Sequence, residues 1–304
     1  MIRYTAGIVD WTLAELDELD RKTRKLMTAN HALHPQSDVD RLYLPRSEGG
    51  RGLQQIRQTV EEEKRSLSEY VSSRKEAALQ EVKQEGLLID GTKREFRRQE
   101  LQSRRQRWSS KPLHGQYLKN IEGKVDETLT WAWLKHGELK KETEGFIMAA
   151  QDQALRTNAI KCKIDKTSNS SMCRLCGDRE ETVDHLVSSC SKIAQTDYKE
   201  RHNKVAAMLH WNLCKKYGLP VTDKWWEHKA EKVVQTAEVK ILWDFKIQTD
   251  KHLAHNIPDI TVVEKAQTYL IDVAIPGDGR IDQKEQEKIQ KYQDLKVEVE
   301  RLWE

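Results

Sequence analysis

The chain has 304 residues, in which 52 basic and 49 acidic side chains leave a formal net charge of +3. Charged residues make up 33% and hydrophobic residues 37%, with nine Trp, eight Tyr and three Phe. The length allows two domains, but the composition argues against one large compact core, so we expect several extended, solvated helices. A net charge this small identifies no partner by itself.

Cysteine usage bears on the cellular compartment. The five cysteines are an odd number, the N-terminus has no apolar signal region, and no stretch is long enough to span a bilayer. We therefore expect an intracellular protein with no disulfides and no membrane partner, in which Cys162 and Cys214 are buried thiols.

The N-terminal part is expected to be helical. Leucines recur at helical spacing over residues 11 to 30, with acidic residues early and basic residues late, which predicts an amphipathic helix. Prolines and the glycines of Glu48–Gly52 predict a loop, and a long charged helix follows over residues 56 to 88, interrupted near Gly86.

A basic run follows, reading KREFRRQELQSRRQRWSSK over residues 93 to 111. Such a run is most often a solvated helix face. An excess of arginine with Trp108 among the cations is also typical of a phosphate-binding stripe. The second interpretation assigns nucleic-acid contacts to Arg97, Arg98, Arg104, Arg105 and Arg107.

The C-terminal part changes character. A helical block over 117–158 and a polar linker over 166–171 lead to a cysteine cluster, after which a helix reaches Tyr217. Alternating patterns then predict three strands, near 243–247, 260–263 and 269–275, between helices over 231–240 and 281–303. The expected class is α+β, mainly helical in the N-terminal two-thirds and ending in a small α/β domain. We divide the chain into residues 1–53, 54–112, 113–165, 166–192 and 193–304.

The cysteine cluster predicts a structural zinc site. It reads Cys173-x2-Cys176-x8-His185-x4-Cys190, and three thiolates with one imidazole complete a tetrahedral zinc shell that leaves no position open for substrate. The alternative is chance placement of these residues.

Two aspartates, in Pro258-Asp259-x12-Asp272, predict a second metal site. If the last two strands form a hairpin centred on Lys265–Ala266, Asp259 lies opposite Asp272 with the Cβ atoms about 5 Å apart. Like charges so placed repel each other, and a bound cation such as Mg²⁺ or Mn²⁺ relieves the repulsion.

The final helix adds cations. Its apolar stripe contains Lys284 and Lys288, with Lys291 at the margin. Either these lysines extend to solvent from a frayed end, or they face a metal-bound phosphate, which assigns Lys284 to nucleic-acid contact.

At these residues the chain resembles the C-terminal region of non-LTR retrotransposon proteins, in which a CCHC zinc knuckle precedes a restriction-like endonuclease of the PD-(D/E)xK type. Residues 19–26, 38–53 and 240–245 also look like blocks of that family, so the resemblance covers most of the chain and is weakest over 54–110. It implies that residues 1–53 are thumb-like, that Asp259 and Asp272 bind the catalytic metal, and that Lys291 is the catalytic lysine. Lys288 is a rival, because the simple motif would place the lysine at Ala274. Glu238 is implied as an auxiliary acid.

The resemblance also implies a function. The protein is expected to nick target DNA in the nucleus, so that reverse transcription of the element RNA can be primed. The chain has no adjacent aspartate pair of the kind a polymerase needs, so the polymerase domain of the same polyprotein is implied as a missing partner. Two alternatives stay open: a catalytically silent module that binds nucleic acid through the zinc knuckle and the basic run, and a helical scaffold that binds protein.

Overall fold

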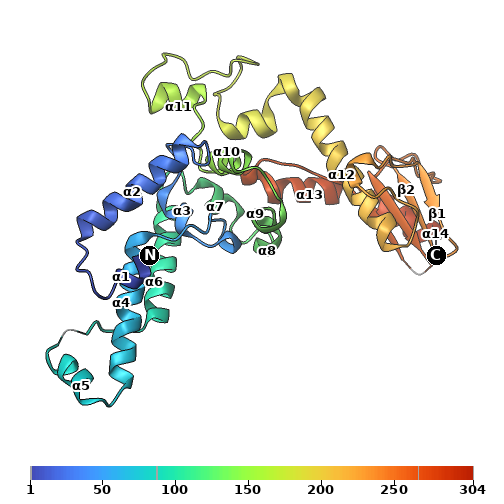
Figure 1. Ribbon diagram of the computed structural model, residues 1–304. Helices are drawn as coiled ribbons and strands as arrows, with labels where there is room; N and C mark the ends of the chain where they lie inside the picture. The colour runs from blue at the N-terminus through green and yellow to red at the C-terminus, as the bar shows by residue number, and fades with distance from the viewer. Residues whose placement is uncertain (1, 87, 266, 304) are drawn as a thin grey trace. The chain divides into compact units, whose positions relative to one another are not determined.

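The computed structural model describes residues 2–86, 88–265 and 267–303, and it divides into two compact units, Met1–Arg156 and Thr157–Glu304. The class is α+β, because helices occur throughout and the described strands form one antiparallel sheet near the C-terminus (Figure 1). The first unit takes in most of the three predicted N-terminal segments, and the second holds the cysteine cluster and the sheet. No helix of the described residues is long and apolar enough to cross a membrane.

The first unit is helical. The amphipathic helix predicted over 11–30 is confirmed as α2, and Thr12 and Glu15 form a capping box at its N-terminus. The long helix predicted over 56–88 is instead two helices, α4 and α5, separated at Arg74. The helices are α1 (Ile2–Thr5), α2 (Leu13–Ala29), α3 (Val39–Tyr43), α4 (Ile56–Ser73), α5 (Ala77–Gln84), α6 (Lys93–Ser110), α7 (Gln116–Ile121), α8 (Glu127–Thr130), α9 (Ala132–His136) and α10 (Lys141–Gln151).

A buried cation holds the first unit together. The Arg41 side chain is fully buried, its guanidinium lies 2.8 Å from Asp152 Oδ1, and it stacks 4.7 Å from the centre of the Trp108 ring. It also donates to the Gly49 and Met148 carbonyls, so segments far apart in sequence share one hydrogen-bonded centre. A buried charge is tolerated when it is paired and hydrogen-bonded in this way.

The second unit places a four-stranded sheet, in the order β1-β2-β3-β4, between helices. Residues of α12 pack with Ile241 and Val262 on one face, whereas Leu295 and Val299 of α14 pack with Leu270 on the other side. The final helix is broken at Tyr292. The elements are α11 (Asn158–Lys163), α12 (Lys199–Lys216), β1 (Val233–Gln235), β2 (Val239–Trp243), β3 (Ile260–Glu264), β4 (Thr268–Ile271), α13 (Ile281–Lys291) and α14 (Gln293–Trp303).

The helix predicted over 231–240 is wrong. That segment is a hairpin in which β1 pairs with β2, and the Thr236 N–H donates to the Val239 carbonyl at the turn. The physical reason is β-branching, since Val233, Val234 and Val239 favour a pleated strand over a helix. The first predicted strand is also shifted, because β2 ends at Trp243 and does not continue to residue 247.

Asp38 should make the stability of the first unit depend on acid pH. Burial opposes ionisation of this carboxyl, but hydrogen bonds from His114 and Lys111 outweigh it and lower its pKa from 3.8 to about 2. Because the folded pKa is depressed, the stabilisation is present above about pH 4 and is lost as the pH falls toward 2. Asp38→Asn should reduce the free energy of unfolding at neutral pH by about 2 kcal/mol.

The measurement is urea unfolding at a series of pH values between 7 and 3. The difference between the wild type and Asp38→Asn should shrink toward acid pH. Asp10→Asn is the control, because the Asp10 side chain is fully exposed. A constant difference at every pH would show that the Asp38 charge is not the cause.

Candidate functional site

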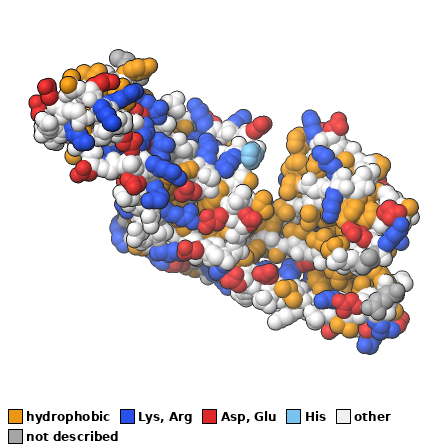
Figure 2. Space-filling model, turned by 90° about the horizontal axis from the view of Figure 1, so that it is seen from below, with side chains coloured by type: hydrophobic (Ala, Val, Ile, Leu, Met, Phe, Trp, Pro, Cys, Tyr) orange, Lys and Arg blue, Asp and Glu red, His pale blue; other side chains and the backbone are white. Residues whose placement is uncertain are grey.

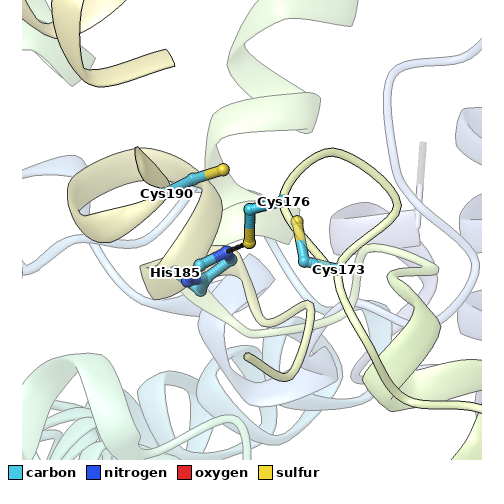
Figure 3. Close-up of side chains that lie close together, drawn as sticks. All are labelled: Cys173, Cys176, His185 and Cys190. Carbon is cyan, nitrogen blue, oxygen red and sulfur yellow. Dashed lines mark hydrogen bonds between the residues drawn. The ribbon is translucent and has the colours of Figure 1, made fainter. Parts of the chain in front are cut away.

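The cysteine cluster forms the group of side chains that its spacing predicts. Cys173, Cys176, His185 and Cys190 bring their ligand atoms within 4.8 Å of one another, and Cys176 Sγ lies 3.3 Å from His185 Nε2 (Figure 3). Zinc bonds of about 2.3 Å to sulfur and 2.0 to 2.1 Å to nitrogen, at a tetrahedral angle, would separate S and N by roughly 3.5 Å. The cluster could therefore bind a metal such as zinc with little movement.

The loop that carries the first two cysteines is organised by a buried carboxylate. The Glu181 side chain is fully buried, and it accepts hydrogen bonds from the Arg174 backbone and guanidinium and from the Asn158 N–H. The Arg174 side chain, opposed by burial, lowers the pKa of Glu181 to about 2. The Asp178 N–H points at Cys176 Sγ and lowers the pKa of that thiol, which favours the thiolate that a metal requires.

The second predicted site lies at one end of the sheet. The β3–β4 register pairs Ile260 with Ile271 and Val263 with Thr268, and this is the register that the sequence predicts. Ala266, in the predicted turn, lies outside the described residues. Continuing the register places Asp259 and Asp272 across from each other, one residue beyond the paired strands.

Asp259 is held by the backbone and by a helix. Its Oδ2 accepts the Val273 N–H at 2.6 Å and lies 3.2 Å from His202 Nε2 of α12. His202 Nε2 is also 3.2 Å from the Val273 carbonyl. One imidazole therefore contacts the residue before β3 and a residue after β4. These contacts fix the Asp259 carboxylate at this end of the sheet.

Asp272 faces the lysines of the final helix. Lys288 Nζ contacts Asp272 Oδ2, and Lys291 Nζ lies 3.7 Å from Oδ1 in a carboxylate that is only 8% exposed. The Tyr292 hydroxyl lies 2.9 Å from Oδ1 and accepts from Lys291. Burial, followed by the hydrogen bond to Asp272, raises the pKa of Tyr292, so this hydroxyl keeps its proton. The Asp272 carboxylate thus accounts for Lys288 and Lys291, whereas Lys284 of the same stripe pairs with Glu287.

Three further residues at this end of the sheet escaped prediction from the sequence. His202 lies within a helix and Tyr292 at a helix break, and neither had a distinguishing pattern. Asp244 follows β2 directly and has a left-handed φ of 43°, and its N–H donates to the Asp259 carbonyl. This conformation is uncommon outside glycine, although aspartate tolerates it better than most residues. The sequence offered one signal for Asp244, which is an acidic side chain next to the end of a strand.

A groove is lined by His202 and Lys288, the residues that contact Asp259 and Asp272, although neither aspartate is among its lining residues. It has a volume of about 370 Å³, and His202, Ala274 and Ser188 are among its lining residues. Ser188 lies between the cluster ligands His185 and Cys190, so the segment that carries these two ligands contributes to the lining of the groove. Five basic side chains and one acidic side chain line it: Lys199, Arg201, Arg280, Lys284, Lys288 and Glu287.

Glu238 is not part of this site. It lies in the β1–β2 turn and pairs with Lys265, at the end of the sheet opposite Asp259. Five residues of β2 separate the two ends, or roughly 16 Å at the usual rise of a strand. Glu238, the predicted auxiliary acid, therefore lies far from the two aspartates, because the helix expected over 231–240 is a hairpin.

The basic run is mostly occupied in structural contacts. It forms α6 beside α4, and Arg97 binds Glu62 of that helix, while Arg105 and Arg107 bind Glu127 and Asp40. Arg104 is buried over the Tyr43 ring, and Trp108 is fully buried. The phosphate-binding assignment is therefore wrong for Arg104. Basic and acidic side chains are interleaved over the face drawn in Figure 2, and Arg98 is exposed.

Within the described residues, two groups of three or more His, Cys, Asp or Glu side chains bring ligand atoms within 4.8 Å of one another, and neither includes Asp259 or Asp272. A magnesium ion at the sheet end would therefore need waters or substrate phosphate oxygens to complete its shell. Magnesium usually binds through one or two carboxylates in that way.

Removing the metal ligands should unfold the cysteine cluster. We expect His185→Ala to abolish zinc binding by these four residues and to expose the amides of residues 171–190 to rapid hydrogen exchange, because metal binding supplies the folding free energy of such a small segment. Cys162→Ala is the control, since this half-buried cysteine lies outside the cluster. Hydrogen exchange with and without a chelator measures the effect. Unchanged protection in chelator would contradict the prediction.

No protein-family model matches the chain, and no match is found among the curated proteins. The geometry of the site therefore carries the functional assignment.

Proposed function

We propose that the protein is a divalent-metal-dependent DNA endonuclease. One observation carries the proposal: Asp259 and Asp272 lie at the same end of the sheet, with Lys288 and Lys291 on Asp272. Paired carboxylates with a neighbouring lysine are the groups that phosphodiester hydrolysis needs.

The two carboxylates would hold Mg²⁺ or Mn²⁺, which lowers the pKa of a bound water for attack on phosphorus. The Asp259 carboxylate is already fixed by the Val273 N–H and by His202, so its orientation requires little reorganisation. A lysine released from Asp272 can offset the negative charge that develops on the phosphate.

Lys288 is the better candidate for that lysine. Its ammonium contacts Asp272 Oδ2 directly and lines the basic groove, whereas Lys291 donates to Tyr292 and lies farther from Asp272. Lys291, the lysine implied by the family resemblance, would then position Tyr292 and Asp272. Binding of a cation at Asp272 would free Lys288 to face the substrate.

The groove suggests how DNA would reach the site. Its five basic side chains suit a phosphate backbone, and Lys284, expected from the sequence to contact nucleic acid, is one of them. The cysteine cluster, loaded with zinc, would hold the segment that contributes Ser188 to the lining of this groove. In the wider proposal, the nick is made in nuclear target DNA, and its 3′ hydroxyl primes reverse transcription of the element RNA by a polymerase domain of the same polyprotein.

Nicking of a supercoiled plasmid in magnesium or manganese tests the proposal. Asp259→Asn and Asp272→Asn should each reduce the nicking rate by at least about 100-fold, because each removes charge that the metal needs. Lys288→Ala should lower the rate at saturating metal, and more strongly than Lys291→Ala.

Lys296→Ala is the matched control, because it removes an exposed lysine of α14 that pairs with Glu300. Circular dichroism verifies that each variant is folded. Equal nicking by the wild type and both aspartate variants would assign the activity to a contaminant and overturn the proposal.

A catalytically silent binding module is the second candidate. The observation that favours it is the ion pair itself, since Lys288 already neutralises Asp272 without a metal. This candidate predicts nucleic-acid binding through the basic groove and no nicking in any divalent metal.

The salt dependence of DNA binding locates the nucleic-acid surface under either candidate. The double variant Arg280→Ala/Lys284→Ala should reduce the slope of log K against log salt by roughly 2, since each phosphate contact contributes about 0.9. The matched double variant Arg94→Ala/Arg98→Ala removes two exposed arginines of α6. A reduced slope in the α6 variant alone would move the binding surface from the groove to α6.

A further inference from the structure

A second group of metal-ligand side chains lies in the core of the second unit. His210, Cys214 and His228 bring their ligand atoms within 4.8 Å of one another. His210 and Cys214 are four residues apart on α12, so both side chains lie on the same face of the helix. His228 comes from the segment between η5, a 3-10 turn (Trp225–Glu227), and β1. We propose that these three residues form a second zinc site, separate from the cysteine cluster.

The distances fit a shared ion. Cys214 Sγ lies 3.6 Å from His210 Nδ1, close to the roughly 3.5 Å that sulfur and nitrogen ligands of tetrahedral zinc require. His210 Nδ1 lies 2.8 Å from His228 Nε2, so opening this pair by about half an ångström would reach the spacing of two nitrogen ligands. One thiolate and two imidazoles are a set that zinc prefers.

The surroundings also suit a bound ion. His210 is fully buried and Cys214 is 1% exposed, and the His210 ring meets the Trp243 ring of β2 edge-on at 5.5 Å. His228 is half-buried, which leaves an entry path and room for a water as fourth ligand.

The local chemistry disfavours both a reactive cysteine and a simple pair of hydrogen-bonded histidines. A reactive cysteine must be accessible to its substrate, but the Cys214 side chain is only 1% exposed. A hydrogen bond between His210 and His228 accounts for their 2.8 Å contact, but it gives no role to the sulfur that faces the same nitrogen.

The site would act as a structural clip. It would attach the segment before β1 to α12, at the edge of a core formed by Cys214, Ile241 and Ile260 with their neighbours. Three protein ligands leave one coordination position to solvent, so this site should lose zinc to a chelator more readily than the four-ligand cluster. Zinc binding at these residues does not depend on the proposed nuclease activity.

Zinc content of the full-length protein tests the inference. After saturation with zinc and gel filtration, the wild type should hold two zinc ions per chain by atomic emission, and His228→Ala should hold one. Cys176→Ala, which removes a ligand of the cysteine cluster, should also hold one. His252→Ala is the matched control, because it removes an exposed histidine outside both groups and should leave two.

Cobalt substitution separates the two sites by spectroscopy. In Cys176→Ala protein loaded with Co²⁺, a thiolate charge-transfer band should persist at the second site, and adding Cys214→Ser should remove it. Equal zinc content in the wild type and in His228→Ala would overturn the inference. His228→Ala removes the most exposed of the three ligands, and its fold is verified by circular dichroism.

Discussion

The antiparallel register of β3 and β4 is the constraint on which the candidate active site depends. Ile260 pairs with Ile271. Asp259 comes directly before Ile260 and Asp272 directly after Ile271, so the two aspartates lie at the same end of the sheet. A slip of one residue would move one aspartate to the other face and separate the pair. The register is fixed by burial of Ile260 and Val262 beneath α12, since a slipped strand would expose both. Packing on one face of the sheet therefore positions the chemistry at its end.

The same end of the sheet joins groups from the helices on either side of it. His202 of α12 contacts Asp259, while Lys288 and Lys291 of α13 and the following Tyr292 contact Asp272. Each carboxylate thus has its own partners. The ammonium groups of Lys288 and Lys291, in place of a metal ion, offset the negative charge of Asp272 and so reduce its repulsion with Asp259. Under the proposed function, a metal ion would replace the ammonium of Lys288 at Asp272, and Lys288 would then be free to contact a phosphate.

Side chains that could bind metal ions lie next to small cores in the second unit. The cysteine cluster has few large apolar residues, and a buried carboxylate, Glu181, organises its loop through Arg174 and Asn158. A proposed second ion at His210 would join the segment before β1 to α12. In the first unit, the buried Arg41 guanidinium stacks on the Trp108 ring and pairs with Asp152. In both units polar groups that are fully partnered take the place of a larger hydrophobic core.

The sequence alone determined the α+β class, the first amphipathic helix, the four residues of the cysteine cluster and the β3–β4 register, because these depend on local spacing and periodicity. It also drew attention to Lys288, since a lysine on an apolar stripe violates a local rule. Only the tertiary structure decided the rest. The hairpin over 233–243 replaced a predicted helix, which moved Glu238 away from the aspartates. Arg104 is buried over the Tyr43 ring and donates to Gln55 at the N-terminus of α4, and the number of charges in the sequence does not predict such burial. The contact of His202 with Asp259 and the contact of His228 with His210 join separate segments of the chain, and such contacts leave no periodic signal in the sequence.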